Sequence, residues 1–195
     1  SNNDGLSTFN WTNDNVEIGL ADSGVGGIPS FQVSNPNQSS ITATITVTPT
    51  YENNGVICDG DSETFTIVVN PSPVMDNVDD IVLCNNENSS LIEFTTINTD
   101  GITSYSWTNN NTTIGLTSNG NGDIPSFTAI NNGVITETAT ITVTPTYDNN
   151  GIICVGSSQT FSISVLSDIE ITGTSIDALD CADPNSGNIN ITVGG

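Results

Sequence analysis

One stretch of this chain occurs twice with almost no change. Residues 42–58 read TATITVTPTYENNGVIC, and residues 138–154 read TATITVTPTYDNNGIIC. The same offset of 96 positions separates Trp11 from Trp107, and an ungapped alignment of residues 1–69 (the first copy) with 97–165 (the second copy) gives 38 identities. A repeat of this length is too long for one solenoid turn and matches a complete small domain, so the sequence predicts domains in tandem.

The repeated segment alternates apolar and polar residues. Ala139, Ile141 and Val143 point to one side of a predicted strand and the intervening threonines to the other, as in an antiparallel sheet with one solvated face. The run from 160 to 165 alternates in the same way, and an Asn-Gly pair between the two runs is typical of a hairpin. Further short apolar runs begin at residues 81, 91 and 102. No helical periodicity is present, so the sequence predicts an all-β fold of tandem immunoglobulin-like β-sandwich domains.

Proline-rich NPSP at residues 70–73 marks a short, stiff junction. We therefore expect residues 1–70 to form an N-terminally truncated domain and residues 71–166 a complete one. Residues 167–195 share no register with the repeat and are expected to begin a different, C-terminally truncated module. Stiff junctions between similar acidic domains predict an extended rod.

The charge balance limits the chemistry. The chain has 22 Asp and Glu residues and no Lys, Arg or His. It therefore has no Ser-His or Cys-His pair, no Schiff-base lysine and no arginine clamp, which leaves paired carboxylates across a cleft as the only acid/base device. Short sandwich domains rarely offer such a cleft, so we expect no enzyme. The acidic surface disfavours nucleic acid and anionic membranes, and no apolar run is long enough for membrane insertion.

The motifs SYSWTN, IGL, IPSF, ATITVTP and TFSISV resemble the PKD-like repeats of very large secreted adhesins from gliding and related Bacteroidetes bacteria. The resemblance covers residues 1–165, and the segment TGTSIDALDCADPNSGNINITVGG resembles the start of a SprB-type repeat. It implies export by the type IX route and display in a cell-surface filament that serves gliding motility and attachment. The stretches WTNDN and WTNNN replace the WDFGDG-like loop of PKD domains, so no ligand role of that loop carries over.

These features favour a structural stalk segment of an extracellular, outer-membrane-attached adhesin. Its expected partners are neighbouring repeats of the same chain, and other parts of the protein would contact an external surface or polysaccharide. Two alternatives are a carbohydrate-binding module and an accessory domain of a secreted hydrolase. Trp11 and Trp107 bear on this choice, because each lies on an alternating strand two residues after an aromatic residue. That position predicts a core tryptophan and not one that stacks on a sugar.

Four cysteines fit an oxidising, extracellular setting, and their spacing matches no zinc motif. One expected disulfide joins Cys84 to Cys154 within one repeat. The alternative joins Cys58 to Cys84 and Cys154 to Cys181. An immunoglobulin topology would place the first-hairpin and last-hairpin cysteines at opposite ends of the domain, which weighs against the pairing within the repeat.

No cofactor is required by this scheme, but two groups of acidic residues are candidates for weak calcium binding. They are Asp59, Asp61 and Glu63 in one loop and Asp76, Asp79 and Asp80 near the junction. Alternating carboxylates can converge on a calcium ion. The second copy has VGSSQ in place of DGDSE at 59–63, so a plain solvated loop is the alternative there.

Overall fold

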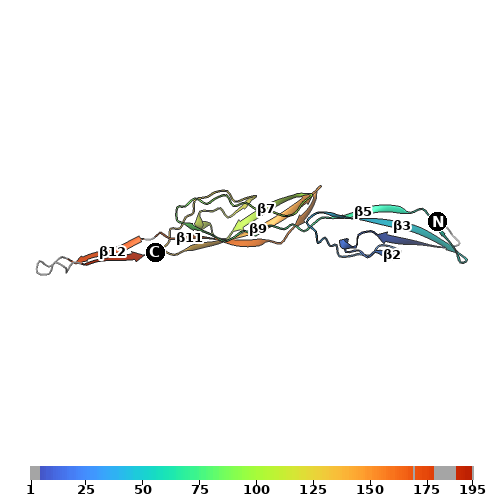
Figure 1. Cartoon of the computed structure of the whole chain (residues 1–195), viewed down its shortest axis with the longest axis horizontal. Helices are drawn as coiled ribbons and strands as arrows, with labels where there is room; N and C mark the ends of the chain where they lie inside the picture. Colours follow the sequence, from blue (N-terminus) through green and yellow to red (C-terminus); the bar gives the residue numbers. More distant parts are fainter. Residues whose placement is uncertain (1–4, 169, 178–187, 195) are drawn as a thin grey trace. The chain divides into compact units, whose positions relative to one another are not determined.

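The computed structural model describes residues 5–168, 170–177 and 188–194. Thirteen strands form its regular structure, and within these ranges there is no α-helix, only short 3-10 turns at Val16–Ile18 and Thr112–Ile114 (Figure 1). The predicted all-β fold is confirmed. By residue contacts the chain divides into two compact units, Ser1–Val74 with Thr96–Thr103 and Thr146–Gly156, and Met75–Thr95 with Ser104–Pro145 and Ser157–Gly195.

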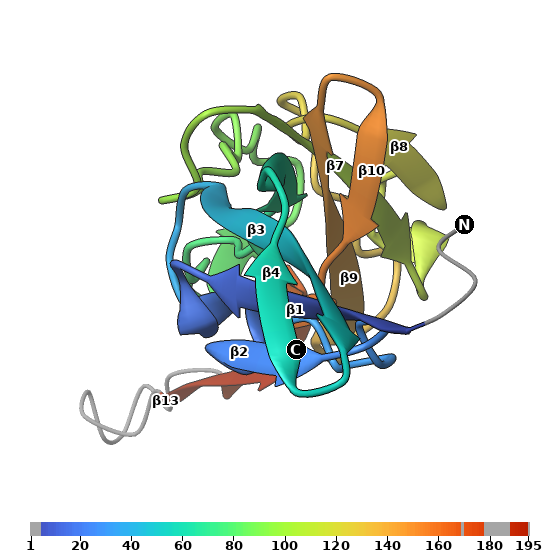
Figure 2. The same cartoon turned by 90° about the vertical axis from the view of Figure 1, so that its right-hand side faces the viewer.

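The first sheet contains five strands. Its path runs β2-β1-β3-β4, and β5 also pairs with the long central strand β3. The strands are β1 (Leu6–Asn13), β2 (Ser23–Val25), β3 (Ile41–Asn53), β4 (Val56–Asp59) and β5 (Glu63–Val69), and all are paired antiparallel. Figure 2 shows the tight β3–β4 hairpin, whose turn holds Asn54 and Gly55 at φ angles of 51° and 80°. Asn-Gly adopts this left-handed pair with little strain, as the sequence predicted.

The second sheet has the same arrangement with one strand added. Its path runs β6-β11-β9-β7-β8, and β10 pairs with β9. The strands are β6 (Ile81–Cys84), β7 (Ile102–Asn109), β8 (Asn119–Asn121), β9 (Glu137–Asn149), β10 (Ile152–Val155) and β11 (Gln159–Leu166). The added strand β6 has no counterpart in the first sheet and runs parallel to β11.

The strand registers repeat with the sequence. Trp11 lies opposite Gly24 and Trp107 opposite Gly120, Tyr51 opposite Cys58 and Tyr147 opposite Cys154, Ile45 opposite Phe65 and Ile141 opposite Phe161. Every one of these pairs recurs at the offset of 96 residues found in the sequence. The two copies are therefore duplicates in backbone pairing as well as in sequence.

Alternation along the strands separates core from solvent as predicted. Ala139, Ile141 and Val143 of β9 are fully buried, and the threonines between them are exposed or half-buried. Phe161, Ile163 and Val165 of β11 are buried in the same core. Because successive strand side chains point to opposite faces, one face of the sheet packs inward and the other meets water.

The inner face of the second sheet packs against extended segments that form a second layer. Met75, Ile92 and Phe94 enter the core from Met75–Thr95, called here the covering segment, and Ile114 enters it from the 3-10 turn. The run at residue 91, predicted as a strand, instead forms only an isolated bridge from Ile92 to Ile124. The domain is sandwich-like, with one regular sheet and one layer of mostly irregular extended chain.

The core of the first copy is smaller. Its buried members are Trp11, Ile18, Leu20, Ala43 and Ile45. Phe31, Ile67 and Val69 are packed against them but only partly buried. Beyond the repeat, β12 (Glu170–Asp177) and β13 (Asn188–Gly194) pair antiparallel as a separate two-stranded sheet.

Candidate functional site

Both tryptophans are core residues. Trp11 is 4% exposed and Trp107 is 3% exposed. Each indole lies against a matched glycine, Gly24 or Gly120, at which an added Cβ would come within 2.3 Å of the indole Cζ2. The core prediction for Trp11 and Trp107 is confirmed, and neither indole face is open to stack on a sugar ring.

A buried asparagine on the tryptophan strand organises the turn that follows it. The Asn109 amide donates to the carbonyls of Leu116 and Thr117 at 3.0 and 3.2 Å, and its Oδ1 accepts the Asn111 N–H at 2.9 Å. Asn13 makes the matched three bonds in the first copy. Buried amides are costly unless they are bonded in this way. The sequence analysis did not single out Asn13 or Asn109, although the occurrence of asparagine at the same position of both copies could have indicated their role.

A second asparagine ties a loop to the last strand of each copy. The Asn131 amide donates to the carbonyls of Ile135 and Val165 at 2.7 and 2.8 Å. Asn35 makes the matched bonds to Ser39 and Val69 at 2.9 and 2.8 Å. Each asparagine binds one carbonyl of its loop and one of the last strand, so it holds the irregular layer against the sheet.

The first acidic group does not form a metal site. Asp59 ends β4 and accepts a hydrogen bond from the Thr50 hydroxyl at 3.1 Å, while Glu63 begins β5. Asp59, Asp61 and Glu63 are all exposed. Among the described residues, no group of three or more His, Cys, Asp or Glu side chains is placed to hold a metal ion. The expected convergence of these carboxylates on calcium is therefore wrong.

The second acidic group is dispersed over separate partners. Asp76 accepts from the Thr95 hydroxyl at 2.6 Å, and Asp79 accepts from the Asn77 amide at 3.3 Å. Asp80 accepts the backbone N–H of Ser162 at 2.7 Å. These side chains do not form a metal-binding group either. The three carboxylates anchor chain segments and do not share a ligand.

The hydrogen bonds to Asp80 have an electrostatic consequence. The backbone N–H and then the side chain of Ser162 hold the pKa of this carboxyl below its ordinary value of 3.8, because both stabilise the ionised form. The ionised Asp80 thus fixes the start of β6 against β11 at neutral pH.

The expected disulfide between Cys84 and Cys154 is not formed. Both thiols are free, as is Cys58. Cys84 lies opposite Leu166 at one end of β11, next to the end of β9 at Glu137, whereas Cys154 lies opposite Tyr147, ten residues further along β9. At about 3.3 Å per residue the two are roughly 30 Å apart, far beyond disulfide reach.

The alternative pairing, Cys58 with Cys84 and Cys154 with Cys181, is also not observed among the described residues. Cys58 and Cys84 are both unpaired, so their bond is absent. Cys154 is also free, and Cys181 lies outside the described residues. The opposite-ends argument from immunoglobulin topology was the correct one for Cys84 and Cys154.

The two copies differ most on the inner face of the sheet. In the first copy Phe9 is 51% and Phe65 46% exposed. The matched Tyr105 and Phe161 of the second copy are 9% and 4% exposed. Pro49, Tyr51 and Ile67 are likewise only partly buried, whereas their counterparts Pro145, Tyr147 and Ile163 are fully buried. We call Phe9, Pro49, Tyr51, Phe65 and Ile67 the open face.

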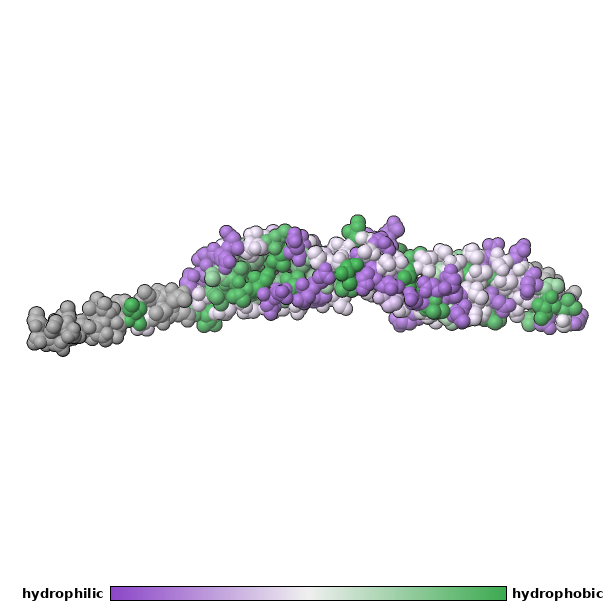
Figure 3. Space-filling model, viewed as in Figure 1, coloured by the Kyte–Doolittle hydropathy of each residue, from purple (hydrophilic) through white to green (hydrophobic). Residues whose placement is uncertain are grey.

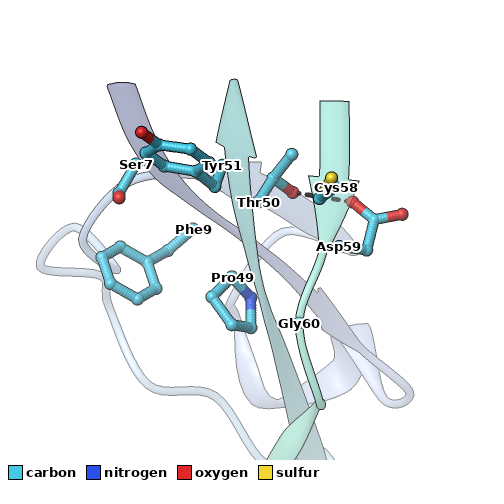
Figure 4. Close-up of a pocket in the computed structure, with 8 residues that line it drawn as sticks. All are labelled: Ser7, Phe9, Pro49, Thr50, Tyr51, Cys58, Asp59 and Gly60. Atoms are coloured by element: carbon cyan, nitrogen blue, oxygen red, sulfur yellow. Dashed lines mark hydrogen bonds between the residues drawn. The ribbon is translucent and has the colours of Figure 1, made fainter. Parts of the chain in front are cut away.

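One end of the open face is a shallow hollow of about 370 Å³. Figure 4 shows the rings of Phe9, Pro49 and Tyr51 beside one another, with the Thr50–Asp59 hydrogen bond at the rim. Phe9 lies directly opposite Pro49 in the β1–β3 register, so both project from the inner side of the sheet. Hydrophobic residues also reach the surface at several other places in Figure 3. The open face is thus an apolar, core-type surface that the described chain leaves in contact with water.

Comparison with known proteins assigns no family. No family model matches the chain, and no curated protein matches it. Among solved structures the chain is similar to one described as the surface layer protein SbsC, domains 1-6, at 15% identity and a TM-score of 0.29. The match covers 95% of this chain and 24% of that one, so this chain spans about a quarter of that chain's length. A TM-score this low carries no argument about function. No described helix is long and apolar enough to cross a membrane.

Proposed function

We propose that this chain is a structural segment of a large cell-surface adhesin, built from tandem β-domains that hold and space other parts of the protein. The supporting observation is that the two copies keep the same buried framework. Asn13 and Asn109 make the same three hydrogen bonds, and so do Asn35 and Asn131. These residues support backbone and contact no candidate ligand site.

The exposed acidic residues of the first copy, in contrast, are not repeated in the second copy. The acidic positions Asp59, Asp61 and Glu63 correspond to Val155, Ser157 and Gln159 in the second copy. A catalytic or binding role belonging to the repeat would require its exposed polar groups in both copies. A role in construction requires only the framework, which supports the structural proposal over an enzymatic one.

The finer parts of the proposal rest on the resemblance to PKD-like and SprB-type repeats. These finer parts are secretion by the type IX route, display on the outer surface of the outer membrane, and a role in gliding motility. A surface with 22 carboxylates and no cationic side chain is compatible with a stalk whose neighbouring domains repel one another. An extended rod remains part of this proposal.

Force spectroscopy on the full chain tests the structural role. The chain is held through non-thiol handles at its two ends, because the described cysteines Cys58, Cys84 and Cys154 are free. We expect separate unfolding events for the two sheets, and the larger should release on the order of 300 Å of contour length, as about 90 to 100 residues would. Unfolding at forces no higher than those that straighten an unstructured chain would contradict a mechanical role.

A carbohydrate-binding module is the second candidate, and one observation favours it. Phe9 and Tyr51 place aromatic rings at an accessible hollow of the first copy. A glycan array with the full chain distinguishes the two functions. Saturable binding that Phe9→Ser abolishes would favour the carbohydrate module over the structural segment.

A further inference from the structure

An apolar hollow lies within the covering segment of the second copy. It measures about 400 Å³, and its lining residues all belong to Met75–Thr95. The apolar part of the lining consists of Val78, Ile81, Leu83, Leu91 and Ile92. Leu91 is 52% exposed, so a large apolar side chain meets water at the mouth of the hollow. The chain from residue 75 to residue 168 is described without a gap, and an apolar surface that stays open within it is typical of a binding groove.

One wall of the hollow is fixed to the sheet. Ile81 and Leu83 belong to β6, which pairs in parallel with β11. Asp80, the residue before β6, accepts the Ser162 backbone N–H at 2.7 Å and holds the start of the strand. This wall therefore keeps its position through contacts that lie outside the hollow.

The other wall is fixed to the second layer. Ile92 and Ile124 exchange both of their backbone hydrogen bonds, each at 3.0 Å. The Ser89 hydroxyl accepts the Phe127 N–H at 3.0 Å, and the Ser89 carbonyl accepts the Ser126 hydroxyl at 2.6 Å. Because each wall is anchored separately, the hollow cannot close without the loss of buried hydrogen bonds. It is a preformed feature of the fold.

The hollow lies beside an open strand edge. β6 is the last strand on its side of the sheet, and among the described strands it pairs with β11 alone. The lining includes residues of β6 and none of β11, which places the hollow toward this edge. A strand edge offers backbone groups to an extended polypeptide, whose alternate side chains would then face the hollow. These features favour a polypeptide over a small molecule as the occupant.

Two carboxylates determine the charge that the occupant should carry. Asp79 and Glu93 are the charged residues of the lining, one on each wall, and both are exposed. Asp79 accepts a 3.3 Å hydrogen bond from the Asn77 amide, and among the described residues no hydrogen bond engages the Glu93 carboxylate. A lysine or arginine side chain would be attracted to this pair. These 195 residues contain no Lys, Arg or His, so a second copy of the chain cannot supply the cation.

We propose that the hollow between β6 and residues 89–93 docks a basic, apolar segment of a different protein. The occupant is an extended polypeptide that runs along the open edge of β6. It seats an apolar side chain against Leu83 and Leu91 and places a lysine or arginine beside Asp79 or Glu93. This inference goes beyond the proposed function and does not depend on it.

Isothermal titration calorimetry of the full chain with end-blocked synthetic peptides tests the chemistry of the occupant. The basic peptide is Lys-Lys-Val-Leu-Val-Lys-Lys, made also with isoleucine or phenylalanine at its centre. The acidic peptide has glutamate in place of every lysine, and the polar peptide has serine in place of the three apolar residues. We expect saturable one-to-one binding of the basic peptide with a negative heat-capacity change, because apolar surface is buried. The acidic and polar peptides should each bind about tenfold more weakly or not at all.

Protein variants locate the site. Leu91→Ser should weaken binding of the basic peptide about tenfold, because it removes apolar area at the mouth of the hollow. Asp79→Asn and Glu93→Gln should each weaken it about two- to fivefold, as the loss of an exposed ion pair does. The matched controls are Val82→Ser, which removes a 63% exposed apolar side chain from the other face of β6, and Glu52→Gln, which removes an exposed carboxylate of the first copy. Both controls should leave the affinity unchanged.

Three results would overturn the proposal. They are no saturable binding of any basic peptide at ~1 mM, binding of the acidic or the polar peptide as tight as that of the basic one, or a loss of affinity in Val82→Ser as large as in Leu91→Ser. Self-association of the chain that Leu91→Ser abolishes would identify a second copy as the occupant and also refute it. If Leu91→Ser lowers the melting temperature, Glu93→Gln decides, because it changes an exposed side chain, and parent-like binding of that variant refutes the proposal. None of these outcomes affects the mechanical test of the structural role.

Discussion

Replacing Trp107 with alanine should strongly destabilise the second copy. The side chain is 3% exposed and lies within a continuous apolar cluster. Gly120, which faces the indole, has no side chain that could move into the space. Truncation of a large buried aromatic residue costs about 3 to 5 kcal/mol when the site cannot collapse. At about 4 °C or more per kcal/mol for a domain of this size, the melting temperature should fall by at least about 12 °C.

The two tryptophans make the assay specific to each copy. Trp107→Ala leaves Trp11 as the only indole, so its fluorescence follows the first copy while circular dichroism follows both. We expect a lowered transition by circular dichroism and an unchanged Trp11 transition, because the two tryptophans lie in separate core clusters that share no residue. Trp107→Phe keeps a large apolar side chain and is the control. Its melting temperature should lie between those of the parent and of Trp107→Ala. A Trp107→Ala variant that melts at the parent temperature would refute the core assignment.

Three further predictions concern single residues. Asn109→Ala should lower the free energy of unfolding by about 1 to 3 kcal/mol in urea, because it leaves buried carbonyls unpaired; a change within error would show that water replaces the amide. Gly120→Ala should cost about 1 to 3 kcal/mol through overpacking, whereas Gly27→Ala, with open space around its Cβ, should be neutral. Asp80→Asn tests the lowered pKa: the carboxylate contributes stability above pH 3.8 and loses it as pH falls through the lower folded pKa. The parent should therefore exceed the variant in stability at pH 7 and approach it in strong acid, and parallel pH profiles would contradict this.

The strands were predictable because their signal is local. Alternation along β9 and β11 and the Asn-Gly turn between β9 and β10 specify a hairpin and an inner face without any knowledge of the rest of the chain. The run at residue 91 has similar apolar content, but its segment packs through Ile92 and Phe94 onto the sheet without a continuous ladder. Composition alone cannot distinguish an extended segment that hydrogen-bonds to a neighbouring strand from one that only packs its side chains on the sheet.

Calcium binding was inferred from spacing, and spacing was insufficient. Alternating carboxylates converge only where the backbone curls around an ion. Asp59 and Glu63 instead lie on the adjoining strands β4 and β5, which extended geometry holds apart. The pairing of Cys84 with Cys154 failed because the two lie at opposite ends of the sheet, as the topology argument against that pairing had indicated.

Burial of the open face could not be read from sequence at all. Tyr51 and Tyr147 share nearly identical neighbours, yet only Tyr147 is fully buried. The local sequence places both rings on the inner side of a sheet, and contacts outside the strand decide whether water reaches them: Tyr147 donates its hydroxyl to the Thr99 carbonyl at 2.7 Å. Burial is therefore a property of the pair of layers and not of the strand.

The need for a second layer also shows which residues fold together as one domain. Taking Phe9 and Phe65 from about half exposed to the few per cent seen at their counterparts would stabilise the domain by roughly 1 kcal/mol each, half the value of full burial. The segment that provides this burial in the second copy, Met75–Thr95, lies before the alignable residues 97–165. The segment that repeats in sequence is thus shorter than the segment that folds as one domain. The unit that buries a complete core extends from the covering segment through β11, and the identical residues are its sheet and turns, which require that cover to become a closed domain.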